Sequence, residues 1–496
     1  MTSPLILAID QGGQSSRVGV YSLQGELLHC FSASCATRHE MVGDVEYIEQ
    51  NPVEILKGIQ SCLDQVRVAL GKDVARISAA GFSGQGSSLL CWNAKTGEAL
   101  SPVLSWQDIR GQHYFKDISL THEQAQSRTG LRVSPHYGAS KMRWCLENNS
   151  QVKHAFDAGS LAIGPIVSYI LWHLCGEFSV DPGHAQRTLL WNLHTKDWDE
   201  NLLQLFKIPR EILPKCKYHS SNFGSLLLGE CKIPFRVSAR DQGASLFARG
   251  LPDKNVGYIN IGTGAFIQRV SERLSAPEGL LVSPLWISEQ TAAQNDIELA
   301  SPVCYANQFE PALYAWEATV NGAASAISFV EKEAGVAITP DVIQRVLELE
   351  PAHACYFLNA VGGLSAPYWR TDLESRFSEN LSADEKILAW LESILFQIFV
   401  NLKLMEQLGP LQKLYVSGGI SRADSICQRL ADLSGVPVVR SENTEASLQG
   451  IAYMAAGLPS VWNQSVGGQI FQPKSNPRLL NRYSLWQNAL NDWLSA

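Results

Sequence analysis

Asp10 to Arg17 combine residue types that suit the binding of a phosphate and its metal ion. The segment reads Asp-Gln-Gly-Gly-Gln-Ser-Ser-Arg and directly follows the apolar run Leu5–Ile9. A carboxylate at the end of a strand can hold a hard cation, and glycines let backbone N–H groups approach an oxyanion. Hydroxyl groups and a guanidinium complete such a site. By itself, however, the segment is more typical of an ordinary hairpin with a polar turn.

A second segment repeats this arrangement in the other half of the chain. The predicted strand Val256–Ile261 is followed by the turn Gly262-Thr263-Gly264 and by a returning strand, Ala265–Ser271. Just before it, Asp241-Gln242-Gly243 opens a predicted helix. Residue identity between the two segments is slight, so the likeness lies in the order of strand, glycine turn and strand. Two such hairpins in separate halves predict two similar α/β domains that face one nucleotide across a cleft.

Hydrophobic periodicity and turn residues indicate the elements that carry these segments. Strands are expected at Leu5–Ile9, Arg17–Leu23, Glu26–Ala33, Ile77–Ser83, Ser88–Trp92, Arg236–Ser238, Val256–Ile261, Ala265–Ser271, Leu414–Ser417 and Val436–Val439. Helices are expected at Asn51–Leu70, Ser140–Glu147, Ile163–Cys175, Ala239–Gly250, Asp384–Leu408, Ala423–Leu433 and Glu445–Ala456, whereas residues 176–235 carry little pattern. We predict an N-terminal domain over 1–237, a C-terminal domain over 238–475 and a helical tail over 476–496.

Composition excludes several classes of protein. A formal net charge of −8 gives no indication of a nucleic-acid or acidic-membrane partner. Eleven cysteines without a C-x-x-C pair argue against a disulfide framework or a structural zinc site. The first residues lack the basic region of a secretory signal, and glycine, proline and histidine interrupt the apolar stretch Leu161–Cys175. We therefore expect a cytoplasmic protein without a membrane span.

Two common nucleotide-binding motifs are absent from the sequence. No G-x-x-x-x-G-K-[ST] is present, which excludes a P-loop enzyme. No G-x-G-x-x-G opens a helix after a strand, so a Rossmann oxidoreductase is set aside as well.

Six motifs follow one another in an order that is more specific than any one of them. They are Asp10–Arg17, Lys141–Trp144, Asp241–Phe247, Gly262–Phe266, Leu391–Gln397 and Ser417-Gly418-Gly419. This ordered set resembles the FGGY carbohydrate kinases, which include glycerol kinase and xylulose kinase. The resemblance runs from Leu5 to Gly457 and implies two duplicated domains of the actin/Hsp70/hexokinase type, a ribonuclease H-like fold, with a cleft between them.

The resemblance implies ATP-dependent phosphorylation of a small sugar or polyol. Such a reaction needs a base for the hydroxyl, a metal ion for the phosphates and donors that spread the charge. Asp241 is expected to be the base, because the start of a helix favours an ionised carboxylate; a plain helix N-cap is the alternative role. Asp10 is expected to hold Mg²⁺. Nucleotide binding is expected from Gly12, Gly13, Gln14, Ser15, Arg17, Gly262, Thr263, Gly264, Gly322, Gly418 and Gly419.

The substrate residues separate this chain from its relatives. Substrate contacts are expected from Ser83, Gln85, Trp106, Asp108, His136, Asp241, Gln242 and Phe266. Glycerol kinases carry an Arg-Glu pair where Gly86-Ser87 stand here, which argues against glycerol. Ser83-Gly84-Gln85 and Trp106-Gln107-Asp108 are more similar to xylulose kinases. We therefore expect a ketopentose such as xylulose, with glycerol as the alternative.

The first loop also departs from the family, because Gly13-Gln14 stand where hydroxyl-bearing residues are usual. This departure favours a competing class, an actin-like nucleotide-binding regulator without sugar kinase activity. The retained Asp10, Asp241 and Thr263 favour the kinase, since a binding protein needs no base. The expected partner is a small sugar or polyol, and a homodimer stays open as the assembly state.

Overall fold

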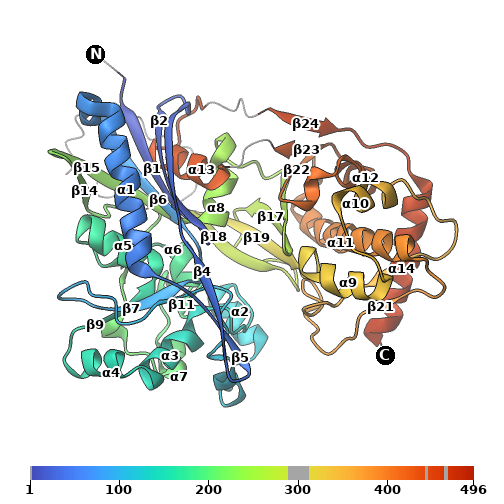
Figure 1. The fold of residues 1–496 in the computed structure, drawn as a ribbon, viewed down its shortest axis with the longest axis horizontal. Coiled ribbons are helices and arrows are strands. Elements are labelled where there is room, and N and C mark those ends of the chain that lie inside the picture. The colour runs from blue at the N-terminus through green and yellow to red at the C-terminus, as the bar shows by residue number, and fades with distance from the viewer. Residues whose placement is uncertain (1–2, 289–311, 442–444, 463–466, 496) are drawn as a thin grey trace. The chain divides into compact units, whose positions relative to one another are not determined.

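The computed structural model describes residues 3–288, 312–441, 445–462 and 467–495 and divides the chain into two compact units (Figure 1). Unit 1 comprises Met1–Pro252, Ser283–Tyr314 and Glu445–Ser465. Unit 2 comprises Asp253–Val282, Ala315–Thr444 and Val466–Ala496. Each unit is built from three separate stretches of the chain, whereas each predicted domain (1–237, 238–475 and 476–496) is one continuous stretch. The predicted domain limits stay a prediction.

Close packing of one helix explains part of the interleaving. Helix α13 (Ala446–Ala455) belongs to unit 1 although it lies late in the sequence. A Cβ added at Gly450 would lie only 1.7 Å from the carbonyl oxygen of Ala244, and one at Gly81 would lie 3.0 Å from the Ile451 side chain. The backbone of α13 thus touches its neighbours at positions where only glycine fits.

The main sheet of unit 1 is mixed. Its strand order is β14 (Ser225–Leu228), β15 (Cys231–Arg240), β6 (Ile77–Gly84), β1 (Leu5–Gln11), β2 (Ser15–Ser22) and β3 (Leu27–Ser34). β1 pairs in parallel with β6, which pairs in parallel with β15, whereas β2 returns antiparallel to β1. All seven residues of β1 are buried, as its apolar run predicts. Helix α1 (Pro52–Leu70) corresponds to the helix predicted over Asn51–Leu70, and Asn51 is its N-cap.

A second sheet in unit 1 contains β7, which corresponds to the predicted strand Ser88–Trp92. Its order is β4 (Thr37–Val42), β5 (Val45–Gln50), β8 (Val103–Leu104), β7 (Leu89–Asn93) and β9 (Leu161–Pro165). The helix predicted over Ile163–Cys175 begins later, as α5 (Ile166–Cys175), because Leu161–Pro165 pairs with β7 instead. The other helices of this region are α2 (His122–Thr129), α3 (Gly138–Asn148), α4 (Ser150–Asp157), α6 (Pro182–Gln186) and α7 (Glu200–Phe206). Short elements such as α6 explain the weak sequence pattern over 176–235.

The second large sheet repeats the hairpin of the first. Its order is β18 (Leu281–Ile287), β19 (Ala312–Val320), β17 (Ala265–Ser271), β16 (Val256–Ile261), β22 (Lys413–Ser417), β23 (Val438–Ser441) and β24 (Gly468–Phe471). β16 pairs antiparallel with β17 and parallel with β22. This matches the relation of β1 to β2 and β6, so the same supersecondary unit occurs twice in the chain.

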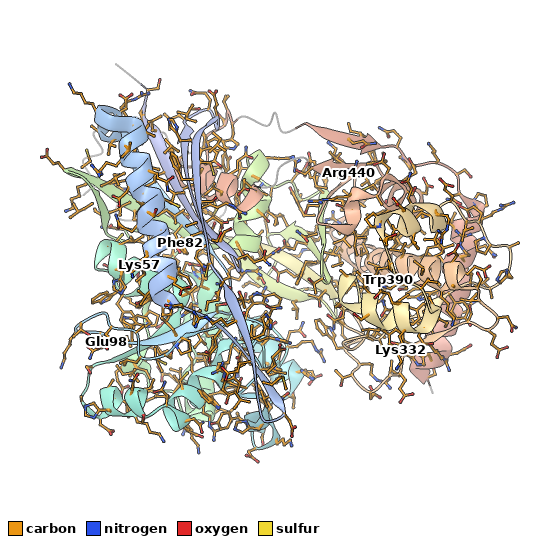
Figure 2. All side chains as sticks on the ribbon, viewed as in Figure 1. Lys57, Phe82, Glu98, Lys332, Trp390 and Arg440 are labelled. Carbon is orange, nitrogen blue, oxygen red and sulfur yellow. The ribbon has the colours of Figure 1, made fainter. Side chains whose placement is uncertain are left out.

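Helix α11 (Ala383–Met405) forms the core of unit 2. Ser382 and Glu385 form a capping box at its start. The stretch Ala383–Leu408 is long and apolar enough to cross a membrane by length and composition, but 83% of its most apolar window is buried inside the protein. Figure 2 shows Trp390 on this helix, and its side chain is fully buried. The other helices of unit 2 are α9 (Ile327–Ala334), α10 (Pro340–Val346), α12 (Asp424–Ser434) and α14 (Pro477–Ser495).

A buried network of ion pairs holds α14 against α11 and α12. Arg482 on α14 donates to both carboxylate oxygens of Glu392 on α11, each at 2.8 Å. Arg429 on α12 donates to the same carboxylate at 2.8 Å, and Glu350 accepts from Arg482 at 2.9 Å. Glu392, Arg429 and Arg482 are all buried. Because buried charges need partners, each arginine depends on the shared carboxylate.

Arg482→Gln should destabilise unit 2 by about 3–5 kcal/mol, because it leaves Glu392 partly unpaired in the interior. Urea unfolding would measure the change. Arg345→Gln is the matched control, since Arg345 forms an exposed pair with Asp384 and its loss should barely shift the midpoint. Equal shifts in the two variants would contradict a stabilising role for the buried network.

Candidate functional site

Three parallel strands of unit 1 end at the same edge of the main sheet and bring the predicted acidic residues together. Asp10 on β1 lies opposite Ser83 on β6, and Gly84 lies opposite Arg240 on β15. The next residue, Asp241, begins helix α8 (Asp241–Leu246). Figure 1 shows β1 beside β6 and α8 beside α13. The sheet register therefore places both predicted catalytic carboxylates at one edge.

Asp10 is suited to holding a hard cation. Its carboxylate is buried and accepts a hydrogen bond from the Ser83 hydroxyl. Burial raises its pKa to about 6, and the negative charge of Asp241 adds to this effect. Among the described residues, no group of three or more His, Cys, Asp and Glu side chains is arranged so that it could hold a metal ion. Asp10 therefore fits Mg²⁺, which takes one or two carboxylates and draws its other ligands from phosphates and water.

Arg17 lies between two acidic side chains. Its Nη1 atom is 4.0 Å from Asp10 Oδ2, and its Nε atom is 3.0 Å from Glu445 Oε2 at the start of α13. The Arg17 side chain remains one-third exposed, at 33%. The guanidinium thus stays beside the Asp10 loop and lies close enough to meet an anion there.

Asp241 is not the N-cap of its helix, because that position is held by Arg240. The backbone N–H of Gln242 donates to Asp241 Oδ1 at 2.6 Å, and the side chain remains partly accessible to solvent. Burial raises the pKa of Asp241, and the positive charges of Arg240, His184 and Arg187 offset only part of the rise. Burial thus acts on the pKa in the direction opposite to the effect expected from the helix N-terminus, and the role of Asp241 as the base stays a prediction.

Ser83 and Gln85 turn inward and support the first loop. The Ser83 hydroxyl donates its hydrogen bond to the Asp10 carboxylate. The Gln85 amide donates to Gln50 Oε1 at 2.7 Å and to Gln11 Oε1 at 3.0 Å, and its own oxygen accepts from the Ser88 hydroxyl. Both side chains are buried, so the predicted direct contact with substrate is replaced by a positioning role.

The carbonyl of Gly13 is the point at which the first loop is fixed. Gln50 Nε2 and Thr37 Oγ1 both donate to it at 2.8 Å. The turn itself closes through a 2.9 Å bond from Gly12 N to Ser15 O, and the Gln14 side chain is exposed. Sequence reasoning missed Gln50 and Thr37, because their partner is a backbone atom more than twenty residues away and no local pattern marks it.

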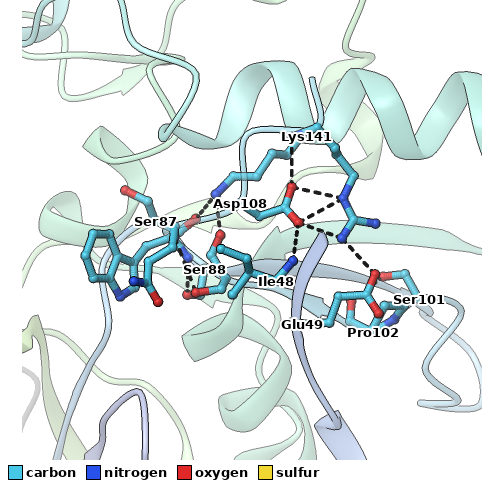
Figure 3. Close-up of polar contacts among 12 residues, drawn as sticks. Ile48, Glu49, Ser87, Ser88, Ser101, Pro102, Asp108 and Lys141 are labelled. Carbon is cyan, nitrogen blue, oxygen red and sulfur yellow. Dashed lines mark hydrogen bonds and ion pairs between the residues drawn. The ribbon is translucent and has the colours of Figure 1, made fainter. Parts of the chain in front are cut away.

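Asp108 is also a positioning residue. It is fully buried, accepts from the Ile48 backbone N–H at 2.8 Å, and both its oxygens are engaged by Arg110 (Figure 3). Arg110 also donates to Glu49 at 2.7 Å. No face of the Asp108 carboxylate reaches solvent, so the structure gives no support to its predicted contact with the substrate.

Lys141 fixes the two segments that flank the predicted substrate residues. Its ammonium group donates to the carbonyls of Ser87 and Ser105 at 3.0 and 2.9 Å (Figure 3). Burial lowers the pKa of Lys141 to about 7. Next to Ser105, the Trp106 side chain is 41% exposed, and its carbonyl lies 3.3 Å from His136 Nδ1. The indole is therefore accessible, and its stacking on sugar C–H groups stays a prediction.

The glycine turns of unit 2 sit at the ends of two parallel strands. Asn260 on β16 lies opposite Ser417 on β22, so the turns after both strands share one edge. The Gly262 N–H donates to Gly264 O at 2.9 Å, and Thr263 O accepts from Ser325 N at 3.0 Å. The Thr263 side chain is exposed, and Phe266 on β17 is 38% exposed.

Two further glycines of unit 2 are required by geometry. Gly418 has a φ of 98°, and a Cβ there would lie 2.4 Å from Ile261 O. Gly322 has a φ of 69°, and a Cβ there would lie 2.3 Å from Asn359 Oδ1. The Gly322 carbonyl accepts from Asn359 Nδ2 and Trp390 Nε1, each at 3.0 Å. Sequence reasoning missed both of these supporting side chains. Gly419 has open space around its α-carbon, which leaves its backbone accessible.

A buried polar cluster lies beneath the edge that carries Asp241. Asp181 accepts from His184 Nδ1 and from the Ser238 hydroxyl, each at 2.6 Å. The other ring nitrogen of His184 lies 3.1 Å from the Gly84 carbonyl. Burial raises the pKa of Asp181, but His184 more than offsets this and holds the pKa below its usual value. Both ring nitrogens of His184 thus lie within hydrogen-bond distance of an oxygen atom.

His219 extends this cluster and must stay neutral. Its Nδ1 atom accepts the Ile287 backbone N–H at 3.1 Å. Burial lowers its pKa to about 4; Asp181 opposes this shift, and the charges of His184 and Arg240 add to it. Because the folded pKa is below the unfolded value of about 6.5, protons bind preferentially to the unfolded chain.

The free energy of unfolding should therefore fall as the pH is lowered from about 6.5 towards 4, where unfolded but not folded His219 is protonated. Urea titrations at several pH values would measure this slope. His219→Gln should flatten it, whereas His39→Gln, at an exposed position, should leave it unchanged. An unchanged slope in His219→Gln would contradict this account.

Comparison with known protein families covers both units. Residues 5–248 match the N-terminal domain of the FGGY family of carbohydrate kinases, and residues 257–457 match its C-terminal domain. The predicted family is thus confirmed. The predicted fold class, two duplicated actin/hexokinase-like domains with mixed α/β sheets, is confirmed as well.

Similar proteins span nearly the whole chain. The glycerol kinase of Geobacter sp. (strain M21) is 30% identical over 91% of this chain and 89% of its own length. Glycerol kinase 1 of Pseudomonas aeruginosa is 32% identical over 91% and 90%. The crystal structure of Plasmodium falciparum glycerol kinase with ADP is 22% identical, covers 99% of this chain and 98% of that one, and has a TM-score of 0.84. The chain therefore belongs to the FGGY family of carbohydrate kinases and is an ATP-dependent phosphotransferase that acts on an alcohol group.

Proposed function

We propose that this chain transfers the γ-phosphoryl group of ATP to a hydroxyl of a small polyol, with Asp241 as the general base. The observation that carries this proposal is the register of β1, β6 and β15, which puts Asp10 and Asp241 at one sheet edge. Asp241 is partly accessible, and its raised pKa makes it a stronger base than an ordinary aspartate.

Asp10 is the residue that would hold Mg²⁺. The ion, when bound, would neutralise charge on the phosphates. The backbone of Gly12, the donors of Arg17 and the hydroxyl of Thr263 would bind the phosphates. Gly418 and Gly419 would leave room for the adenosine, since each presents backbone without a side chain. Asp241 would take the proton of the acceptor hydroxyl as its oxygen attacks the γ-phosphorus.

The relatives favour glycerol over xylulose as the parent substrate. Both curated relatives described above are named glycerol kinases. The xylulose expectation relied partly on Asp108, which is buried and occupied by Arg110. A three-carbon polyol is therefore the better supported core of the substrate. Gly86-Ser87 still separate this chain from the Arg-Glu pair of glycerol kinases, so its acceptor should differ from glycerol itself.

An actin-like regulator remains the second candidate, supported by Gly13-Gln14. The arrangement of Asp241 favours the kinase, because a regulator has no use for an accessible carboxylate with a raised pKa. Release of ADP that depends on an added polyol would support the kinase. A cytoplasmic location and a homodimer stay predictions.

Asp241→Asn should lower kcat about 10²–10⁴-fold, because the amide cannot accept the hydroxyl proton. A coupled assay of ADP formation measures the loss, and urea unfolding checks that the fold is retained. Asp44→Asn, in the exposed turn between β4 and β5, is the matched control and should retain full activity. Near-wild-type turnover in Asp241→Asn would contradict the proposed mechanism.

Gly13→Thr should raise kcat/KM for ATP by roughly 2–10-fold, the value of one added neutral hydrogen bond. A Cβ at Gly13 meets no atom within 4 Å, so the side chain has room. Steady-state kinetics with varied ATP measure the change. Gly13→Val is the isosteric control that lacks the hydroxyl, and equal gains in both variants would contradict the proposed hydrogen bond.

A further inference from the structure

Gln85 is the centre of a buried set of hydrogen bonds in unit 1. Its Nε2 atom donates to Gln50 Oε1 at 2.7 Å and to Gln11 Oε1 at 3.0 Å. Its Oε1 atom accepts from the Ser88 hydroxyl at 2.9 Å. All four residues are buried, with at most 2% of each exposed. Both amide hydrogens and the amide oxygen of Gln85 thus have buried partners, and these four residues form one connected hydrogen-bond chain, the Gln85 chain.

On one side, the Gln85 chain ends at the first loop. Gln50 Nε2 donates to the Gly13 carbonyl at 2.8 Å, and Gln11 Nε2 donates to the Gly12 carbonyl at 2.6 Å. The backbone N–H of Gln85 adds a 3.1 Å bond to the Gln11 carbonyl. Two adjacent carbonyls of the loop that is predicted to bind phosphate are therefore held by side chains that Gln85 orients.

On the other side, the Gln85 chain ends at the segment that carries the exposed indole. The Trp106 backbone N–H donates to Ser88 Oγ at 2.9 Å. Lys141 joins the same two segments a second time, because its ammonium group donates to the carbonyls of both Ser87 and Ser105 (Figure 3). The backbone from which the Trp106 indole extends is therefore held to the same buried chain as the first loop.

The two ends of the Gln85 chain fix the direction of its hydrogen bonds. The Trp106 N–H can only donate, and the carbonyls of Gly12 and Gly13 can only accept. Rotation of the Gln85 amide by half a turn would bring buried donors against donors, so one orientation satisfies every partner. Hydrogen bonds that follow one another in this way polarise each other, and coupling between distant groups is carried by such networks.

We propose that the Gln85 chain couples the binding of the phosphoryl acceptor at Trp106 to the binding of ATP at the first loop. Because the chain holds both segments in one arrangement, a ligand that stabilises either segment favours that arrangement at the other. Thermodynamic linkage makes the effect reciprocal, so each substrate binds more tightly in the presence of the other. The inference rests on the proposed kinase function and describes the regulation of the same site.

Isothermal titration calorimetry of the purified full chain measures the coupling directly. The acceptor is the compound with the highest kcat/KM for ADP formation among glycerol, erythritol, xylitol and xylulose. The nucleotide is adenylyl imidodiphosphate with Mg²⁺, an ATP analogue that transfers no phosphoryl group. Each ligand is titrated with and without a saturating amount of the other, and each affinity should rise about 5-fold or more.

Variants along the Gln85 chain test whether it carries this effect. Gln85→Met keeps the side-chain length but removes every hydrogen bond of the amide, so the coupling factor should fall to about 1. Gln85→Glu still accepts from Ser88 but cannot donate to Gln50 or Gln11, so it should weaken binding of the analogue more than that of the acceptor. Ser88→Ala removes only the link to Trp106 and should weaken acceptor binding more.

Thr37→Val is the matched control for the first loop. Thr37 donates to the same Gly13 carbonyl at 2.8 Å, but it lies outside the Gln85 chain. Its loss should weaken binding of the analogue by roughly 2–10-fold, the value of one hydrogen bond, and leave the coupling factor unchanged. Thr129→Val, at a buried position on α2, should change neither affinity. Urea midpoints verify that each variant is folded.

Three results would overturn the inference while leaving the kinase function intact. They are wild-type affinities that do not depend on the other ligand, full coupling in folded Gln85→Met, and an equal loss of coupling in Thr37→Val. If Gln85→Met does not fold, full coupling in Ser88→Ala has the same meaning, because this variant lacks only one hydroxyl. Absence of phosphorylation with all four acceptors would overturn the proposed function and the inference with it.

Discussion

Parallel pairing between β1, β6 and β15 is the constraint on which the site depends. It places Asp10 beside Ser83 and Arg240 beside Gly84, and Asp241 follows at once. A slip of one residue in any of these strands would turn its side chains to the opposite face of the sheet. The same parallel pairing occurs between β16 and β22, and each of these two neighbouring strands is followed by a glycine turn. In both units the sheet core, rather than a flexible loop, sets the position of the functional groups.

The site carries an electrostatic cost that its ligands would offset. Burial raises the pKa of Asp10 and Asp241, and the charge of Asp241 raises that of Asp10 further. Arg17 and Arg240 oppose this for Asp10 and Asp241, respectively. A cation bound at Asp10 would offset the remaining cost of burying the negative charges of Asp10 and Asp241. The buried pair of Asp181 and His184 lies behind this edge and fixes the backbone of Gly84 from below.

Local features of the sequence were predictable, and distant partners were not. Val256–Ile261 and Ala265–Ser271 have the predicted limits, because apolar alternation and a glycine turn specify a hairpin locally. The predicted helix over Ile163–Cys175 began too early, since β9 is a strand only through its pairing with β7. Ile48, whose backbone N–H donates to Asp108, lies sixty residues away, and no sequence pattern predicts this contact. The close approach of the Arg187 and Arg240 side chains to Gly86 likewise could not be predicted, because both arginines are distant from Gly86 in the sequence.

In the proposed mechanism, ATP is cleaved by transfer of its γ-phosphoryl group to an alcohol, with Asp241 as the general base. Phosphorus NMR of the purified chain with ATP, Mg²⁺ and a small polyol tests this most directly. The account predicts that the γ-phosphate signal is replaced, in equal amount, by a phosphate ester, and that Asp241→Asn forms none. Conversion of ATP to inorganic phosphate alone, or ester formation by Asp241→Asn at the wild-type rate, would contradict it.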